Sequence, residues 1–140
     1  MFKMVSPKVA RGLKSGRVVR VRNARRSIPP LLIGEGVPTR VNANLGASPG
    51  NVSLKKEVLK ARVAVEYGAD TLMDLSVGCD LRRMRRALIK RIPVPWGTVP
   101  VYEAFSGKSL DVSLQDILKV VERQARDGVE IGRASCRERV

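Results

Sequence analysis

Short apolar segments typical of β-strands alternate three times with longer amphipathic segments typical of α-helices. The expected strands are 41–45, 69–75 and 94–99, and the expected helices are 54–67, 81–90 and 114–126. A helix between two strands is the usual connection in a parallel sheet, because parallel neighbours need a long crossover. The sequence therefore predicts an α/β fold with three successive right-handed βα units.

Three such units do not complete a fold, because a parallel sheet needs cover on both faces. Val129 would begin a fourth strand. We therefore interpret residues 41–129 as part of a larger domain. Residues 1–40 precede it as a basic segment with ten Lys or Arg and a single acid, Glu35.

The basic segment carries only weak structural signals. Residues 8–14 favour a short helix, 17–21 a strand, Ser27–Pro30 an extended stretch and 34–36 a turn. A solvated arm or part of a subunit interface is the preferred interpretation, since charge alone is not a nucleic-acid-binding motif.

Helical spacing predicts which side of each helix is buried. The expected apolar faces are Leu54, Val58, Ala61 and Val65 on the first helix, Leu81, Met84 and Leu88 on the second, and Ile117, Leu118, Val121 and Ala125 on the third. The arginines of the second helix are expected to face solvent or another subunit.

The net charge of +14 suggests nucleic acid or another anionic partner. With only one Trp, two Tyr and two Phe, however, the chain offers no stacking platform for single strands. It has no apolar run of 18 residues, and Cys79 and Cys136 are isolated thiols. These features favour a cytoplasmic protein with neither a membrane span nor a nucleic-acid partner. The absence of His argues against a complete metalloenzyme or hydrolase in this chain.

Two amides occupy the first expected strand. Asn is depleted in strands, and residues two apart point to the same face, so Asn42 and Asn44 should lie side by side. Neutral amides both donate and accept, which suits a polar ligand such as a base or a ribose. A pair of turn-forming residues at a strand end is an equally good interpretation of this spacing.

Three motifs resemble phosphomethylpyrimidine synthases, in the order and spacing of that family. They are Thr39-Arg-Val-Asn-Ala-Asn-Leu-Gly46, Gly68-Ala-Asp-Thr-Leu-Met-Asp-Leu-Ser76 and Pro93-Val-Pro-Trp-Gly-Thr-Val-Pro-Val-Tyr102. The likeness also includes residues 5–19 and extends to about Val129. It implies the first three units of a (β/α)8 TIM-like barrel in a thiamine-biosynthesis enzyme.

The resemblance implies radical S-adenosylmethionine chemistry, as a carbon–carbon lyase that rearranges aminoimidazole ribotide into hydroxymethylpyrimidine phosphate. Barrels of this kind bind ligands at the C-terminal ends of the strands. The family's substrate positions fall on Asn44, Met73 and Tyr102. Asn44 would hydrogen-bond the substrate, Met73 would offer a soft apolar surface, and Tyr102 would add a ring and a hydroxyl. Without the resemblance, Met73 reads as a core residue.

The family's other parts have no counterpart here. The resemblance implies a longer chain, expected to be a homodimer, that uses a 4Fe-4S cluster and S-adenosylmethionine, with zinc as a further candidate. The family's cluster-binding cysteines lie near the C-terminus, and its metal-binding histidines lie in the later barrel strands. Neither Cys79 nor Cys136 matches the cluster motif. We therefore expect no metal ligands in this fragment and no activity from it alone. The paralogous 5-hydroxybenzimidazole synthase, which makes a cobamide lower ligand from the same substrate, stays an alternative, as does a basic nucleic-acid-binding protein.

The last residues do not resemble the family. Residues 130–140 read as the translation of a short-read sequencing adapter, with charge where an apolar strand should continue. We therefore expect this tail to be non-native and to pack poorly.

Overall fold

The computed structural model describes residues 6–106 and 112–133. Within these residues, no helix is long and apolar enough to cross a lipid bilayer. The elements of the predicted βα region, in chain order, are β3 (Asn42–Leu45), α2 (Leu54–Glu66), β4 (Thr71–Asp74), α3 (Leu81–Ile89), β5 (Trp96–Thr98), α4 (Pro100–Ala104), α5 (Leu114–Asp127) and β6 (Ile131–Gly132).

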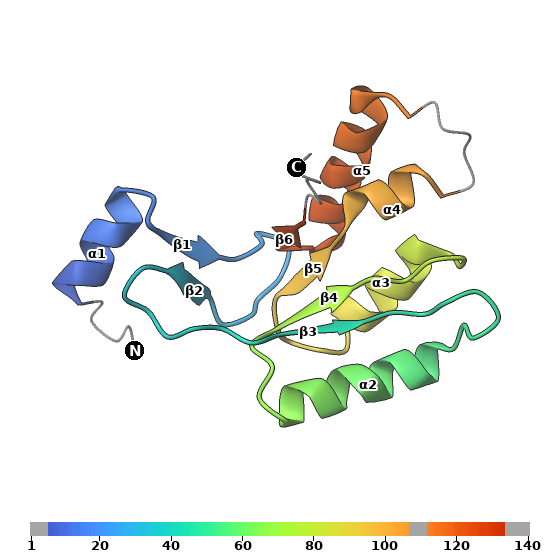
Figure 1. Ribbon diagram of the computed structural model, residues 1–140, viewed down its shortest axis with the longest axis horizontal. Helices are drawn as coiled ribbons and strands as arrows, with labels where there is room; N and C mark the ends of the chain where they lie inside the picture. Colours follow the sequence, from blue (N-terminus) through green and yellow to red (C-terminus); the bar gives the residue numbers. More distant parts are fainter. Residues whose placement is uncertain (1–5, 107–111, 134–140) are drawn as a thin grey trace, which may run out of the picture.

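These four strands form one parallel sheet in the order β3-β4-β5-β6 (Figure 1). The order in space follows the order in sequence, as the strand–helix alternation predicts. The strands are shorter than their apolar segments. The parallel α/β arrangement is confirmed, and its closure into a barrel stays a prediction.

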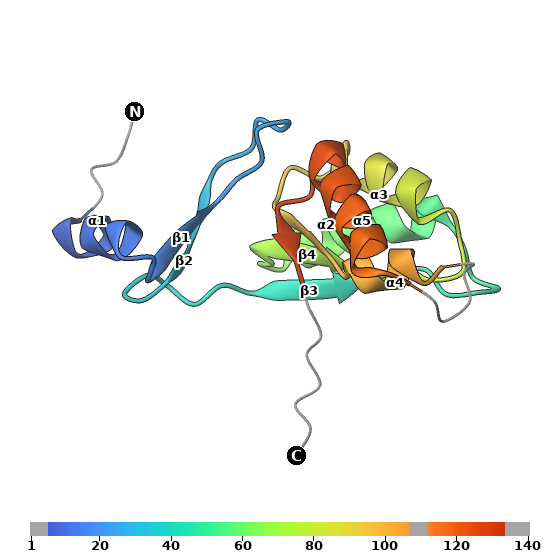
Figure 2. The same ribbon diagram turned by 90° about the horizontal axis from the view of Figure 1, so that it is seen from above.

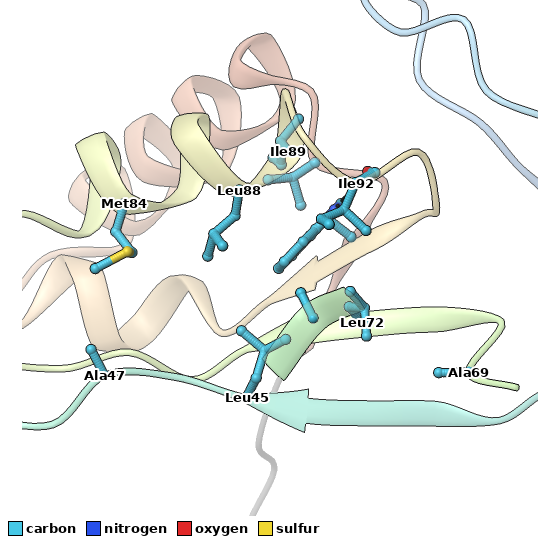
Figure 3. Close-up of a cluster of buried hydrophobic side chains, with 11 residues drawn as sticks. Leu45, Ala47, Ala69, Leu72, Met84, Leu88, Ile89 and Ile92 are labelled. Atoms are coloured by element: carbon cyan, nitrogen blue, oxygen red, sulfur yellow. Dashed lines mark hydrogen bonds between the residues drawn. The ribbon is translucent and has the colours of Figure 1, made fainter. Parts of the chain in front are cut away.

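Helices cover one face of the sheet. Figure 2 shows α2, α3 and α5 on the same side of the strands. The core lies between α3 and this face: Leu45 and Leu72 face Leu88 and its neighbours (Figure 3). The fully buried Trp96 belongs to the same cluster. Burying side chains of this size contributes about 1.5–3 kcal/mol each.

The N-terminal segment is more ordered than its sequence suggests. Ser6 caps α1 (Pro7–Lys14), with Pro at the helix start, as the Ser-Pro pair predicts. β1 (Val18–Val21) and β2 (Leu31–Gly34) pair as an antiparallel hairpin. A turn follows β2 at the expected position, residues 34–36. The strand before it, Leu31–Gly34, was not predicted.

Two side chains fasten the loop of this hairpin to the ends of α3 and α5 and to the segments just before β5 and β6. Asn23 Nδ2 donates to the carbonyl oxygens of Ala125 and Val129 at 2.9 and 2.8 Å. The guanidinium of Arg26 forms an ion pair with Glu130 at 2.9 Å and also donates to the carbonyl oxygens of three residues, Ile89, Ile92 and Val94. These side chains are therefore part of the fold and not of a solvated arm.

The expected helix faces are only partly right. Ala61, Met84 and Leu88 are buried as predicted. On α5 the buried residues are Val120 and Gln124, whereas Leu118 and Val121 are 49% and 43% exposed. The stripe with the best apolar spacing therefore faces outward, so the prediction for this helix is wrong. It fails because the inner side of α5 meets polar groups.

The prediction that all residues from 130 on pack poorly is wrong for the first of them. The side chain of Glu130 is fully buried, and its carboxylate accepts from the backbone N–H of Trp96 at 2.8 Å. Ile131, in β6, pairs with Gly97 of β5. A carboxylate with an arginine partner can be buried, so charge did not exclude a strand here. Residues 134–140, including Cys136, lie outside the described residues.

Candidate functional site

A polar ladder crosses the face of the sheet opposite the helices. Thr71 lies beside Asn42 in register, and Met73 lies beside Asn44. Thr71 Oγ1 donates to Asn42 Oδ1 at 2.9 Å, and Asn42 Nδ2 donates to Asn44 Oδ1 at 2.9 Å. The predicted side-by-side placement of the two amides is confirmed.

The direction of this ladder determines what Asn44 can offer. Its Oδ1 is occupied by Asn42, and its Nδ2 has no partner within the described residues. Asn44 is exposed, so its amide group presents two donors to solvent. The arrangement favours a ligand atom that accepts hydrogen bonds. Sequence reasoning found both amides but missed Thr71, because strand register is not visible in one sequence.

Met73 continues the same face toward β5. It is 7% exposed and lies beside Gly97 in register. A Cβ on Gly97 would come within 2.8 Å of Met73 Cε, so the glycine leaves room for the methionine to lie across β5. Asn42, Thr71, Met73 and Ile131 line a cavity of about 390 Å³ together with Arg40 and residues of the 33–39 stretch. Its volume is within the range of small-ligand sites.

The C-terminal end of β4 carries a buried carboxylate. Asp74 accepts hydrogen bonds from the backbone N–H and the hydroxyl of Ser76, and the Ser76 hydroxyl oxygen also accepts from the N–H of Ala47. Burial raises the pKa of Asp74, against the hydrogen bonds from Ser76 and the charge of Arg85, which lower it. A Cβ on Gly46 would lie 2.6 Å from Ser76 N, so the chain after β3 can approach this loop only as glycine.

Tyr102 lies on α4, a short helix that the sequence analysis did not predict. It is 44% exposed and lines a cavity of about 20 Å³ at the ends of β4 and β5. Asp74, Ser76, Arg85, Thr98 and Glu103 are among the other residues that line this cavity. A space of this size holds about one water molecule and is too small for a nucleotide-sized substrate.

An ion-pair network connects α4 to α3 and α5. Arg85 is 2% exposed and pairs with Glu103 at 2.7 Å and with Asp127 at 2.9 Å. Glu103 also accepts from Gln124 Nε2 at 2.7 Å, and Gln124 Oε1 accepts from Thr98 at 2.6 Å. Burial opposes ionisation of Glu103, but the Gln124 hydrogen bond and the Arg85 charge hold its pKa below the usual value. These contacts fix α4, and with it Tyr102, relative to β5.

The three predicted site residues are thus brought together only in part. Asn44 and Met73 are register neighbours on the face opposite the helices. Tyr102 follows β5 and lines a different cavity from either of them. Asn44 itself lines a third space of about 410 Å³, with Gly46, Ser48 and Lys60. That all three contact one substrate stays a prediction.

The residues present do not fit a metal or an iron–sulfur cluster. Within the described ranges, no group of three or more His, Cys, Asp or Glu side chains could hold a metal ion. The whole sequence has two cysteines and no histidine, which is too few for a cluster with three or more cysteine ligands. The described part of the chain thus carries polar groups that can form hydrogen bonds, but no set of side chains arranged to hold a metal ion.

Comparison with known proteins agrees with the motif spacing. A family model described as the Radical SAM ThiC family matches residues 3–134. The chain belongs to this family. The match ends at residue 134, four residues past the start of the expected tail at Glu130. That residues 130–140 are non-native stays a prediction.

Several curated relatives carry the name phosphomethylpyrimidine synthase. The protein of Methanopyrus kandleri is 45% identical over 137 residues, and that of Thermodesulfovibrio yellowstonii is 41% identical over 134 residues. The alignments cover 92% and 91% of this chain but only 32% of each relative. The Thermus thermophilus protein is 42% identical over 90% of this chain and 31% of its own length. The chain thus spans about a third of the relatives that it matches.

Proposed function

We propose that this chain is part of a phosphomethylpyrimidine synthase that converts aminoimidazole ribotide into hydroxymethylpyrimidine phosphate in thiamine biosynthesis. The single observation that carries the proposal is the family match over residues 3–134. The relatives' names favour the pyrimidine product over the hydroxybenzimidazole alternative. The reaction class, a radical S-adenosylmethionine carbon–carbon lyase, is proposed with it.

The proposed role of this chain is to bind and orient the substrate. Asn44 would donate from Nδ2 to an accepting oxygen or ring nitrogen, and Met73 would pack against the flat imidazole. The Thr71–Asn42–Asn44 ladder supports this assignment, because it holds the Asn44 amide in one orientation. Tyr102 is assigned by resemblance alone, at the C-terminal end of β5.

The cofactors belong to the rest of the full-length protein. We propose that segments outside this chain hold the 4Fe-4S cluster and S-adenosylmethionine, and that the complete barrel forms a homodimer. A zinc site has no support from the described residues. The 140-residue chain should therefore give no product when it is supplied with reconstituted cluster reagents, S-adenosylmethionine and aminoimidazole ribotide.

The full-length gene product provides the test. After cluster reconstitution and reduction, it should form hydroxymethylpyrimidine phosphate from aminoimidazole ribotide, with thiamine auxotrophy rescued in cells. Asn44→Ala should lower kcat/KM by about tenfold or more, since an unpaired polar group costs about 1–3 kcal/mol. Asn51→Ala, a change of the same size in an exposed loop, is the matched control.

The ladder adds a second variant pair. Thr71→Val removes the donor to Asn42 and should raise KM more than it lowers kcat, because Asn44 is then free to turn. Thr71→Ser keeps the hydroxyl and should stay near wild type. Activity of the 140-residue chain alone, or full activity of Asn44→Ala, would refute the proposed roles. Formation of 5-hydroxybenzimidazole would replace the proposed product.

A further inference from the structure

A basic groove lies along the outer side of α3, away from the candidate site. One cavity of about 600 Å³ lies between the hairpin loop and the end of α3, and its lining includes Arg25, Arg86, Lys90 and Arg91. A second cavity of about 440 Å³ continues along α3 and shares Arg86 and Lys90 with the first. The shared residues place the two cavities next to each other along α3, and together they are called the groove here.

The positive charge of this groove is largely uncompensated. In the part of the chain that the structure describes, no ion pair involves Arg25, Arg83, Lys90 or Arg91. Both carboxylates that line the groove are already engaged. Asp80 accepts from the N–H of Arg83, and Asp127 accepts from Arg82 and Arg85. Asp127 also lies 3.8 Å from Arg86, so Arg86 is partly compensated, whereas Arg25, Lys90 and Arg91 are not.

The C-terminal end of α3 repels an anion in the groove less strongly than a helix C-terminus normally would. Such an end presents carbonyl oxygens and partial negative charge. Here Arg26 Nη2 donates to the carbonyl oxygens of Ile89 and Ile92 at 3.2 and 3.0 Å. These acceptors are therefore turned to a guanidinium, and the exposed cations dominate the field in the groove.

The shape of the groove indicates the size of its partner. Its larger cavity is within the range of small-molecule sites and has Ile28, Ile89 and Pro93 among its lining residues. No aromatic side chain lines either cavity, so there is no platform for stacking the successive bases of a single strand. A short chain of phosphates with an attached apolar group matches this combination of lysine, arginine and aliphatic surface.

We propose that the groove along α3 binds a nucleoside polyphosphate, with the phosphate chain on Arg25, Arg86, Lys90 and Arg91 and the nucleoside over Ile28, Ile89 and Pro93. This site is separate from the substrate face of the sheet and does not depend on the proposed enzyme activity. Any link between its occupancy and catalysis would be regulatory.

Isothermal titration of the 140-residue chain at low ionic strength tests the proposal, with ATP and inorganic tripolyphosphate as separate probes. One-to-one binding of both is expected, with ATP the tighter ligand because its nucleoside contacts the apolar lining. Arg25→Gln/Lys90→Gln removes two exposed cations, one on each side of the larger cavity. It should weaken ATP binding by about tenfold or more, since each charged hydrogen bond contributes about 1.5–3 kcal/mol.

The control is Lys55→Gln/Lys56→Gln, which removes the same charge from the first turn of α2, outside both cavities. It should change affinity by less than about twofold, after a modest correction for net charge. Equal losses in the two double variants would show diffuse attraction to a +14 protein and overturn the site. The absence of binding, or tighter binding of tripolyphosphate than of ATP, would also overturn it. Tighter binding of a DNA duplex than of ATP would also contradict the proposal, because the partner of the groove would then be a nucleic acid.

Discussion

Arg85 shows how one residue can depart from the pattern of its neighbours. It lies in the run Arg82, Arg83, Arg85 and Arg86, and the sequence gives no sign that one of the four points inward. The structure buries Arg85 because two carboxylates, Glu103 and Asp127, come to it from α4 and α5. Those partners are 18 and 42 positions away along the chain, so helical periodicity could not reveal them.

Arg85→Ala should therefore destabilise the fold strongly. Removing one partner of a buried ion pair leaves uncompensated charge and costs about 3–5 kcal/mol. Arg83→Ala, at an exposed site without an ion pair in the described structure, should change stability by less than about 0.5 kcal/mol. Urea unfolding followed by the fluorescence of buried Trp96 measures both. Similar unfolding midpoints for the two variants would contradict the network.

Asp74 should make the stability depend on pH. Burial raises its pKa above the usual value, so the folded chain holds this proton more tightly than the unfolded chain. Its favourable contribution is complete in acid, below the ordinary carboxyl range, and is lost as the pH rises through the folded pKa. Asp74→Asn keeps an acceptor for Ser76 and should gain stability relative to wild type as the pH rises above the ordinary carboxyl range.

Asp127→Asn provides the opposite case. Burial opposes ionisation of Asp127, but hydrogen bonds and charge from Arg82 and Arg85 hold its pKa below the usual value. Its contribution is present at neutral pH and is lost as the pH falls through the folded pKa, so this variant should be weakest near neutrality. Denaturant unfolding at several pH values measures how the unfolding free energy of each variant, relative to wild type, changes with pH. The same sign for both variants would contradict these assignments.

At the scale of elements, local signals predicted the helices better than the surfaces they bury. Ser53, Asp80 and Ser113 cap α2, α3 and α5 directly before the expected helix starts at residues 54, 81 and 114. A cap depends on residues within one turn, so these starts are visible in the sequence. The short helix α4 was not predicted, although Pro100 suits the first turn of a helix. The buried side of α5 was missed because its inner contacts are polar.

Leu114, Leu118 and Val121 are left as an exposed apolar stripe on α5. Their spacing is that of a helix face that packs against another helix. The proposed barrel would provide such a neighbour, since the relatives are about three times as long as this chain. The sequence pattern thus indicated a real apolar face but not what lies against it in this part of the protein.

Ser113 should contribute measurably to α5. Its hydroxyl accepts from the N–H of Asp116, and the Asp116 side chain accepts from the N–H of Ser113, which is a complete capping box. Ser113→Ala should cost about 1 kcal/mol of unfolding free energy. Ser48→Ala, at an exposed loop position, should cost less than about 0.5 kcal/mol. Equal thermal unfolding midpoints for the two variants would show that the Ser113 cap does not contribute measurably to stability.

At the scale of the whole molecule, the parallel order of the sheet was predictable and its N-terminal anchoring was not. The strand–helix alternation requires crossovers and so determines the parallel pairing. The contacts of Asn23 and Arg26 with residues about 100 positions away follow no local rule. For the candidate site, the sequence placed Asn42 beside Asn44, but the donor from Thr71 required the register between strands.

The contact between Arg26 and Glu130 leads to a prediction about where this chain can be shortened. The side chain of Glu130 is fully buried, pairs with Arg26 and accepts from the N–H of Trp96, and Ile131 continues the sheet next to β5. A chain that ends at Val129 should lose about 3–5 kcal/mol, because Arg26 would keep its buried guanidinium without the carboxylate.

A chain that ends at Arg133 keeps both the ion pair and β6. Residues 134–140 carry no alternating apolar pattern, so their removal should leave the unfolding free energy within about 0.5 kcal/mol of the full chain. Urea unfolding of the two truncated chains, together with Glu130→Gln in the full chain, separates the carboxylate from the strand. Glu130→Gln should recover part of the loss seen on truncation at Val129, because it retains β6 and an acceptor for the Trp96 N–H. Equal stability of the two truncated chains would show that the sheet ends at β5, and the charged residues after Val129 would then lie outside the fold, as their composition alone suggests.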